Sequence, residues 1–235
     1  MKGKKGSHVG LVLSFVIFVT FIIFIYSITA PVTRVERGKQ DLLEFLKVEL
    51  INEFSADMTT ETILILDDSV DTCIKIDTED ASNLLTIAKD EETGEILESY
   101  FNGDEVEVKR DGAVRLKIYY SEKFVDGVAS LGCTLISEDS YEFGLVRTLE
   151  YVFNYSIVNF SQHISNAENY EAVKARFNIA ASDNFGFVFE DGERNIIVQT
   201  QEQEVSTDIY VEEVPIQYVD NEANIKPGFL KIKVW

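Results

Sequence analysis

An uncharged segment near the amino terminus constrains this chain more than any other feature. No Asp, Glu, Lys or Arg occurs from Val9 to Ala30. A helix rises about 1.5 Å per residue, so a helix of this length spans the roughly 30 Å hydrocarbon core of a bilayer. The sequence therefore predicts a transmembrane helix over residues 9–30, membrane lipid as a partner, and one large domain on one side of the membrane.

Two other interpretations of this segment fit less well. A cleavable secretory signal has an apolar stretch of about 7–15 residues and ends in a small-x-small site. Here the stretch is longer, and Ile28 stands where a small residue is required. A helix buried in a soluble domain has one apolar face, whereas this helix is apolar all round, which is typical of a membrane or the centre of a bundle.

Charge is distributed unevenly along the chain. The first acidic residue is Glu36, so all 41 Asp and Glu follow the apolar segment. Only Lys2, Lys4 and Lys5 precede it, which leaves 18 basic residues and a net charge of −23 beyond it. Such a domain repels the phosphates of nucleic acid and of anionic lipid. The sequence therefore predicts a solvated acidic surface and no nucleic-acid partner.

The amino-terminal tip carries a resemblance to a known family. Lys4-Lys5-Gly6 runs directly into Ser7-His8-Val9-Gly10-Leu11 and the apolar helix. This arrangement resembles the class III signal peptides of archaeal type IV pilins and archaellins. The resemblance implies cleavage by a membrane peptidase between Gly6 and Ser7, and self-association through the retained helix. Many pilins have Glu where Leu11 stands, and a plain signal anchor is the alternative.

The remaining chain predicts an α+β protein. We expect a basic cytoplasmic tip over 1–8, the transmembrane helix over 9–30, an amphipathic helix over 31–57 and an acidic β-rich domain over 58–235. Pro31 is expected to end or kink the span. In the second helix, apolar residues recur at spacings of three and four; they are Leu42, Leu43, Leu46, Leu50 and Phe54.

From about residue 60 the apolar pattern changes to that of strands. Residues 105–109 and 114–119 alternate across a turn at 110–112, which predicts one hairpin, and residues 84–88 and 96–100 predict another. A short helix is expected near 169–177, and further strands near 185–189, 196–198, 208–218 and 228–235. This spacing favours a mainly antiparallel, sandwich-like head.

Two pairs of residues are candidate modification sites. Cys73 and Cys133 lie in strand-like runs and are candidates for one disulfide, with two buried free thiols as the alternative. Asn154 and Asn159 each begin an Asn-x-Ser acceptor triplet for N-glycosylation. If residues 151–160 form a strand, these two side chains point to opposite faces, and at most one is glycosylated.

No catalytic, cofactor or metal site is indicated. His163 is the only histidine beyond the membrane segment, and no Gly-rich phosphate loop precedes a helix. The acidic runs at 67–71 and 220–224 resemble calcium ligands in composition, but both are interpreted as solvated turns.

The positively charged flanks do not settle the orientation, because Arg34, Arg37, Lys39 and Lys47 balance the tip. The candidate disulfide, the acceptor triplets and the acidic surface favour an outward domain. We therefore expect a non-enzymatic, single-pass structural or adhesive protein of the cell surface, with a pilin-like subunit as one form. An anchored binding module for a glycan, a peptide or an envelope partner is the alternative.

Overall fold

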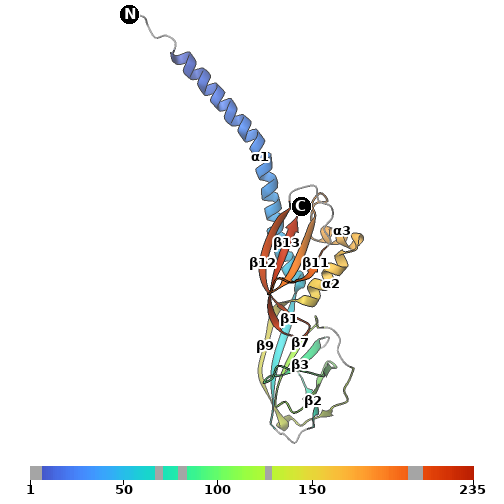
Figure 1. The fold of residues 1–235 in the computed structure, drawn as a ribbon. Helices are drawn as coiled ribbons and strands as arrows, with labels where there is room; N and C mark the ends of the chain where they lie inside the picture. The colour runs from blue at the N-terminus through green and yellow to red at the C-terminus, as the bar shows by residue number, and fades with distance from the viewer. Residues whose placement is uncertain (1–6, 67–70, 79–83, 125–128, 201–208) are drawn as a thin grey trace, which may run out of the picture.

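A computed structural model describes residues 7–66, 71–78, 84–124, 129–200 and 209–235. Side chains are described from residue 10 onward, except those of residues 28–37. The chain forms one long helix followed by a β-rich head (Figure 1). The prediction of an α+β chain with a mainly antiparallel sheet is therefore confirmed.

Helix α1 runs without interruption from Ser7 to Phe54. The helix continues through Pro31, so the expectation that this residue ends it is wrong, whereas a kink at Pro31 remains a prediction. A proline removes one backbone hydrogen bond, and a long helix accommodates that loss when its other bonds persist. The expected amphipathic helix is thus the second part of α1, and strand β1 begins directly at Ser55.

Thirteen strands and two further α-helices follow within the described residues. The first strands are β1 (Ser55–Ile65), β2 (Cys73–Asp77), β3 (Leu85–Asp90), β4 (Ile96–Leu97), β5 (Ser99–Phe101), β6 (Glu105–Lys109), β7 (Arg115–Ser121) and β8 (Thr134–Leu135). A 3-10 turn η1 (Glu138–Ser140) precedes β9 (Tyr141–Phe153), α2 (Asn154–Ile164) and α3 (Ala167–Arg176). The last strands are β10 (Phe185–Asp191), β11 (Ile196–Gln199), β12 (Tyr210–Val219) and β13 (Ile225–Val234).

These strands form two sheets. A nine-stranded sheet has the order β11-β10-β13-β12-β9-β1-β7-β3-β4, and a four-stranded sheet has the order β5-β6-β2-β8. Within the described residues, the two halves of the large sheet are joined by a short parallel contact, in which Val152 and Phe153 of β9 pair with Tyr218 and Val219 of β12. The large sheet therefore has a narrow waist.

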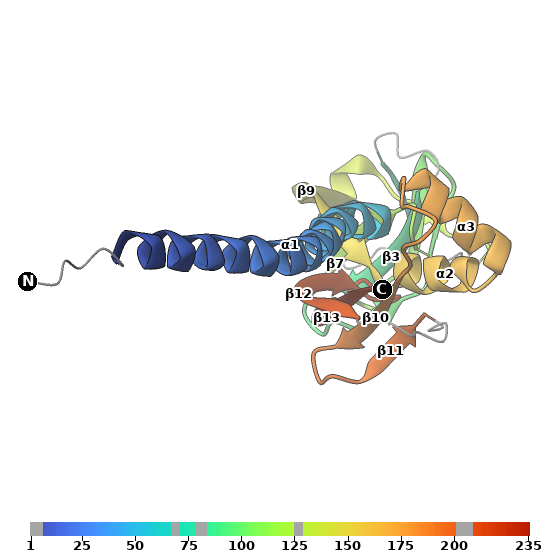
Figure 2. The ribbon, with the colours of Figure 1, turned by 90° about the horizontal axis from the view of Figure 1, so that it is seen from above.

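The waist divides the head into two lobes, which Figure 1 shows one below the other. The proximal lobe consists of the end of α1 with α2, α3 and β10–β13, and it contains the carboxyl terminus. The distal lobe consists of β2–β8 and the strands β1 and β9 where they pair with β7 and with each other. Figure 2 shows α1 projecting from the head as a single rod.

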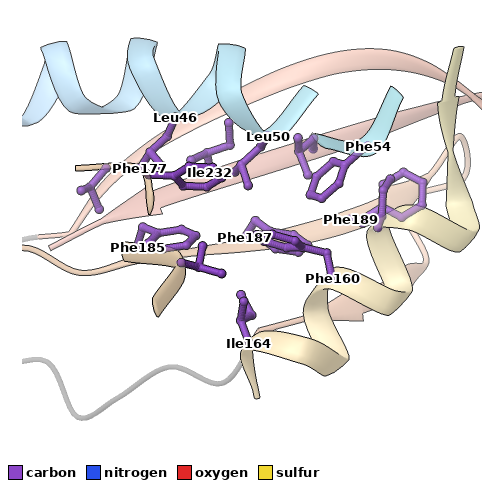
Figure 3. Packing of buried hydrophobic residues seen from close by; sticks show 14 of the residues in the cluster. Leu46, Leu50, Phe54, Phe160, Ile164, Phe177, Phe185, Phe187, Phe189 and Ile232 are labelled. Atoms are coloured by element: carbon purple, nitrogen blue, oxygen red, sulfur yellow. The ribbon is translucent and has the colours of Figure 1, made fainter. Parts of the chain in front are cut away.

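The core of the proximal lobe forms around the end of α1. Leu46, Leu50 and Phe54 are fully buried, and they lie against the phenylalanines of β10 and α2 (Figure 3). The ring of Phe54 lies 5.5 Å from those of Phe160 and Phe187. The predicted apolar spacing of this helix is thus confirmed by its burial.

The core of the distal lobe lies between the two sheets. Ile74 and Ile76 of β2, with Val106 and Val108 of β6, cover buried residues of the large sheet that include Ile63, Leu116 and Ile118. The predicted pairing of residues 84–88 with 96–100 is confirmed at its closed end, where Ala88 pairs with Leu97 and Lys89 with Ile96.

The predicted hairpin of residues 105–109 with 114–119 is wrong. Strand β6 belongs to the four-stranded sheet and β7 to the nine-stranded sheet. At the turn between them Asp111 and Gly112 both have positive φ, 46° and 96°. The guanidinium of Arg110 is buried there and donates to the carbonyl oxygens of Asp71 and Ala113, each at 3.2 Å. The two apolar faces therefore oppose each other across the core instead of lying side by side.

Candidate anchor and modification sites

The first half of α1 stands away from the head. From Gly10 to Ser27 its mean hydropathy is 2.5 and none of it is buried, so by length and composition it can cross a membrane. Its large apolar side chains other than the half-buried Val19 are exposed, with exposed fractions between 45% for Ile25 and 68% for Leu11. The hydroxyl of Thr20 donates to the carbonyl oxygens of Val16 and Ile17, and that of Ser27 to Ile23. Because these hydroxyls are bonded to the backbone of the preceding turn, the surface of the segment stays apolar.

The candidate cleavage site lies at the start of this helix. Ser7 is its first residue, whereas Gly6 lies outside the described residues. Cleavage between them would therefore leave the described helix intact, and it remains a prediction.

The second half of α1 is fixed to the head by ion pairs as well as by its apolar face. The ammonium of Lys39 lies 2.8 Å from the carboxylate of Asp183, and that of Lys47 lies 2.8 Å from Glu212 of β12. Hydrogen bonds to Glu212 and Glu44 raise the pKa of Lys47, so this side chain stays charged. The apolar rod is thus attached to the head through charged contacts around an apolar core.

A disulfide joins Cys73 at the start of β2 to Cys133 just before β8, with Cα atoms 4.9 Å apart. Strand β8 pairs in parallel with β2 directly beyond it, Ile74 with Thr134. The candidate pair of cysteines therefore attaches the chain near residue 133 to the four-stranded sheet.

A buried carboxylate holds the same segment, and sequence reasoning missed it. Glu107 is 2% exposed and accepts from the backbone N–H groups of Leu131 at 2.6 Å and Gly132 at 2.9 Å. Burial alone would raise the pKa of Glu107, but these donors, with Ser130 and Lys75, outweigh it and lower that pKa. The alternation Glu-Val-Glu-Val predicts an exposed Glu, and nothing local in the sequence indicates that residues 130–132 cover it.

The two glycosylation candidates lie on a helix. The condition that residues 151–160 form one strand is not met, because β9 ends at Phe153 and α2 begins at Asn154. The Oδ1 atom of Asn154 is buried and has no hydrogen-bond partner within the described structure. Asn159 is exposed and lines a cavity of about 490 Å³ together with Tyr155 and Arg176. The structure thus leaves Asn159 the more accessible acceptor of the two.

The other candidate residues from the sequence either form hydrogen bonds with residues near them in the chain or lie outside the described residues. His163 is exposed near the end of α2, where the side-chain amide of Asn169 donates to its carbonyl oxygen at 3.0 Å. In the turn at 220–224, Asp220 accepts from the backbone N–H groups of Glu222 and Asn224, and it lies 2.7 Å from Lys226. The run at 67–71 lies outside the described residues except for Asp71.

Comparisons of the chain with protein-family models, with curated proteins and with solved structures find no match. Any function must therefore be argued from the residues of this chain.

Proposed function

We propose that this chain is a membrane-anchored, outward-facing structural or adhesive protein of the cell surface, built as a pilin-like subunit. One observation carries the proposal: the apolar half of α1 is exposed all round, while the other half of the same helix is packed into the head. Exposed apolar surface of this extent requires lipid or other apolar helices around it. Bilayer insertion and helix-to-helix packing in an assembly both meet that requirement.

The head has features that support an outward position. A disulfide persists in oxidising compartments and is rare in the cytosol. The acidic surface and the exposed acceptor Asn159 are also compatible with this side of the membrane. The four-stranded sheet packs on the distal half of the large sheet. We propose that this sandwich-like arrangement forms a compact outer module of the surface protein.

Placing charges on the free half of α1 tests the anchor. The full chain is expected in the membrane fraction, and Ile17→Arg with Phe21→Arg is expected to release it, because each arginine at mid-span costs about 2.5–3.5 kcal/mol on the insertion scale. Ile196→Arg with Val211→Arg is the matched control, since these side chains are as exposed but lie on the head. Equal fractionation of both variants would contradict the anchor.

Two measurements on cells test the remaining parts. Protease added to intact cells is expected to remove the head, and a protected head would contradict the outward position. Mass spectrometry of the mature chain is expected to show Ser7 as its first residue. An intact Met1 would favour the second candidate, a single-pass binding module.

A further inference from the structure

A cavity of about 730 Å³ opens on one face of the nine-stranded sheet. Its lining includes Lys117 and Tyr119 of β7, whose neighbours Leu116 and Ile118 point into the core between the sheets. Since successive side chains of a strand point to opposite faces, the cavity lies on the face turned away from the four-stranded sheet. This volume is typical of small-molecule sites.

The strand register places the polar side chains of the cavity in two adjacent rows. Thr60 of β1 pairs with Arg147 of β9 on one side and with Tyr119 of β7 on the other. In the next row, Thr62 pairs with Lys117. Arg147 and Lys117 are therefore separated by one strand, about 10 Å across the sheet. Their long side chains can reach the same small ligand from two sides.

Two positively charged side chains face each other on adjacent strands beside the cavity. Lys117 pairs directly with Lys89 of β3, and like charges in directly opposite positions destabilise a sheet. Both ammonium groups lie over the ring of Tyr119, at 5.7 Å and 5.6 Å from its centroid. Lys89 is buried and donates to the side chain of Asn224 at 2.6 Å. Burial lowers the pKa of Lys89, against the opposite effect of Asp220 and Glu222.

Two side chains of the lining are cations, Lys117 and Arg147. Within the described residues, neither Lys117 nor Arg147 forms an ion pair. The lining also contains the acidic side chain of Glu91. In a domain with a large excess of carboxylates, these two cations in one cavity form a local site for an anion.

The lining also offers hydroxyl groups and rings. Among the described residues, the hydroxyls of Thr60 and Thr62 have no hydrogen-bond partner, whereas that of Thr59, on the other face, bonds to Thr148 at 2.8 Å. Leu145 and the ring of Tyr151 form apolar walls. The cavity thus combines cations for a carboxylate, hydroxyls for polar groups and flat apolar surface.

We propose that this cavity binds a small sugar acid, with its carboxylate between Lys117 and Arg147, its hydroxyl groups at Thr60 and Thr62, and its apolar ring face against Leu145. Such a ligand has the single negative charge, the hydroxyls and the apolar ring face that these side chains complement. The proposal gives the adhesive role a ligand. It rests on the proposed outward position of the head only in that the ligand would then come from outside the cell.

The net charge of the head limits the size of the ligand. Beyond the apolar segment the chain carries a net charge of −23, and a long polyanion would meet that charge outside the cavity. Surface charges are screened over about 8 Å at physiological ionic strength, so a ligand confined to the cavity is affected mainly by the lining. The site therefore fits a mono- or disaccharide with one carboxylate.

Calorimetric titration of the full chain in detergent tests the proposal with three probes. Cellobiouronic acid, a disaccharide with one carboxylate, is expected to bind. Cellobiose, its neutral counterpart, is expected to bind at least tenfold more weakly, and inorganic phosphate is expected not to compete. No binding of the acid, equal binding of cellobiose, or equal competition by phosphate would each overturn the proposal.

Variants locate the binding in this cavity. Lys117→Gln and Arg147→Gln are each expected to weaken binding of cellobiouronic acid about tenfold, and Thr60→Val severalfold. Lys109→Gln removes an equal charge from an exposed position on the four-stranded sheet and is expected to leave binding unchanged. Unchanged affinity in both Lys117→Gln and Arg147→Gln would overturn the site. Because this assay uses detergent, its outcome is independent of the membrane and cleavage tests above.

Discussion

The two lobes of the head are stabilised in different ways. The proximal lobe has a core rich in phenylalanine that forms around α1, whereas the distal lobe has an aliphatic core between two sheets and is cross-linked by a disulfide. At the waist between them, β9 and β12 pair through two residue pairs within the described structure, and a small apolar cluster that includes Phe124, Phe153 and Val219 packs beside this pairing. The difference teaches that the anchor helix is also part of the core of the proximal lobe. Among the residues described, the distal lobe has no such helix and is stabilised by its own core and its disulfide.

The largest expected effect comes from the disulfide. Cys73→Ser opens a loop with a sequence separation of 60 residues, and its loss is expected to destabilise the distal lobe by about 4 kcal/mol on the chain-entropy estimate. Hydrogen exchange at Ile74 and Val106 measures the distal lobe. The fluorescence of Trp235, the single tryptophan, measures the proximal lobe.

The proposed difference between the lobes would be contradicted if Cys73→Ser lowered the stability reported by both probes. An equal shift in the unfolding midpoints of Trp235 fluorescence and distal exchange would mean that the head unfolds as one unit.

The second prediction concerns the contact of α1 with the proximal core. Leu46 is fully buried, so Leu46→Ala is expected to cost about 3 kcal/mol and to lower the urea midpoint of Trp235 fluorescence. Val48→Ala, at a position that is 53% exposed on the same helix, is the matched control and should change it by less than about 0.5 kcal/mol. Similar effects of both variants would show that α1 does not contribute its apolar face to this core.

The third prediction concerns the buried carboxylate of the distal lobe. Hydrogen bonds to a charged group contribute about 1.5–3 kcal/mol, so Glu107→Gln is expected to destabilise this lobe by roughly 2 kcal/mol at neutral pH. Because the pKa of Glu107 is lowered in the folded state, its contribution is present above the ordinary glutamate pKa of about 4.3. It is lost as the pH falls below that value towards the folded-state pKa.

Thermal unfolding of the wild type and Glu107→Gln at pH 7 and at pH 3 tests this loss of stabilisation at acid pH. The difference between the two proteins should shrink at acid pH. Glu98→Gln, at an exposed position beside Lys109, should differ little from the wild type at either pH. A difference for Glu107→Gln that does not depend on pH would contradict the role of its charge.

The smallest effect is expected at the ion pair between α1 and the proximal lobe. Lys39→Gln should cost less than about 1 kcal/mol, since the pair with Asp183 is partly exposed. A double-mutant cycle with Asp183→Asn measures the coupling, which should fall in 1 M salt. A coupling that does not change with salt would show that the contact is not electrostatic.

Much of the secondary structure could be predicted because it depends on local periodicity. Leu46, Leu50 and Phe54 repeat at helical spacing, and they do form the buried face of α1. Residues 185–191 and 196–199 form two of the expected strands, and they pair with each other, Phe189 with Val198. The start of α2 was not predictable in this way, because its apolar residues continue those of β9 without a turn signal.

Partners across the core could not be predicted. Val106 and Leu116 lie on strands that alternate as a hairpin would, yet they face each other from different sheets. Lys117 and Arg147, which form the proposed site, lie far apart in the chain and meet through the pairing of β1 with both β7 and β9. Alternation reveals which side of a strand is apolar, and it carries no information about which strand lies next to it.

By itself, therefore, the sequence determined a long apolar helix, an amphipathic continuation, an acidic head rich in strands and one pair of cysteines. These properties depend on composition and on the spacing of neighbouring residues. Only the tertiary structure decided that α1 is one helix from Ser7 to Phe54, that Glu107 is covered, and that Lys117 and Arg147, which form no ion pair among the described residues, share a cavity. These features arise from contacts between segments distant in the chain, which the packing of the whole core selects.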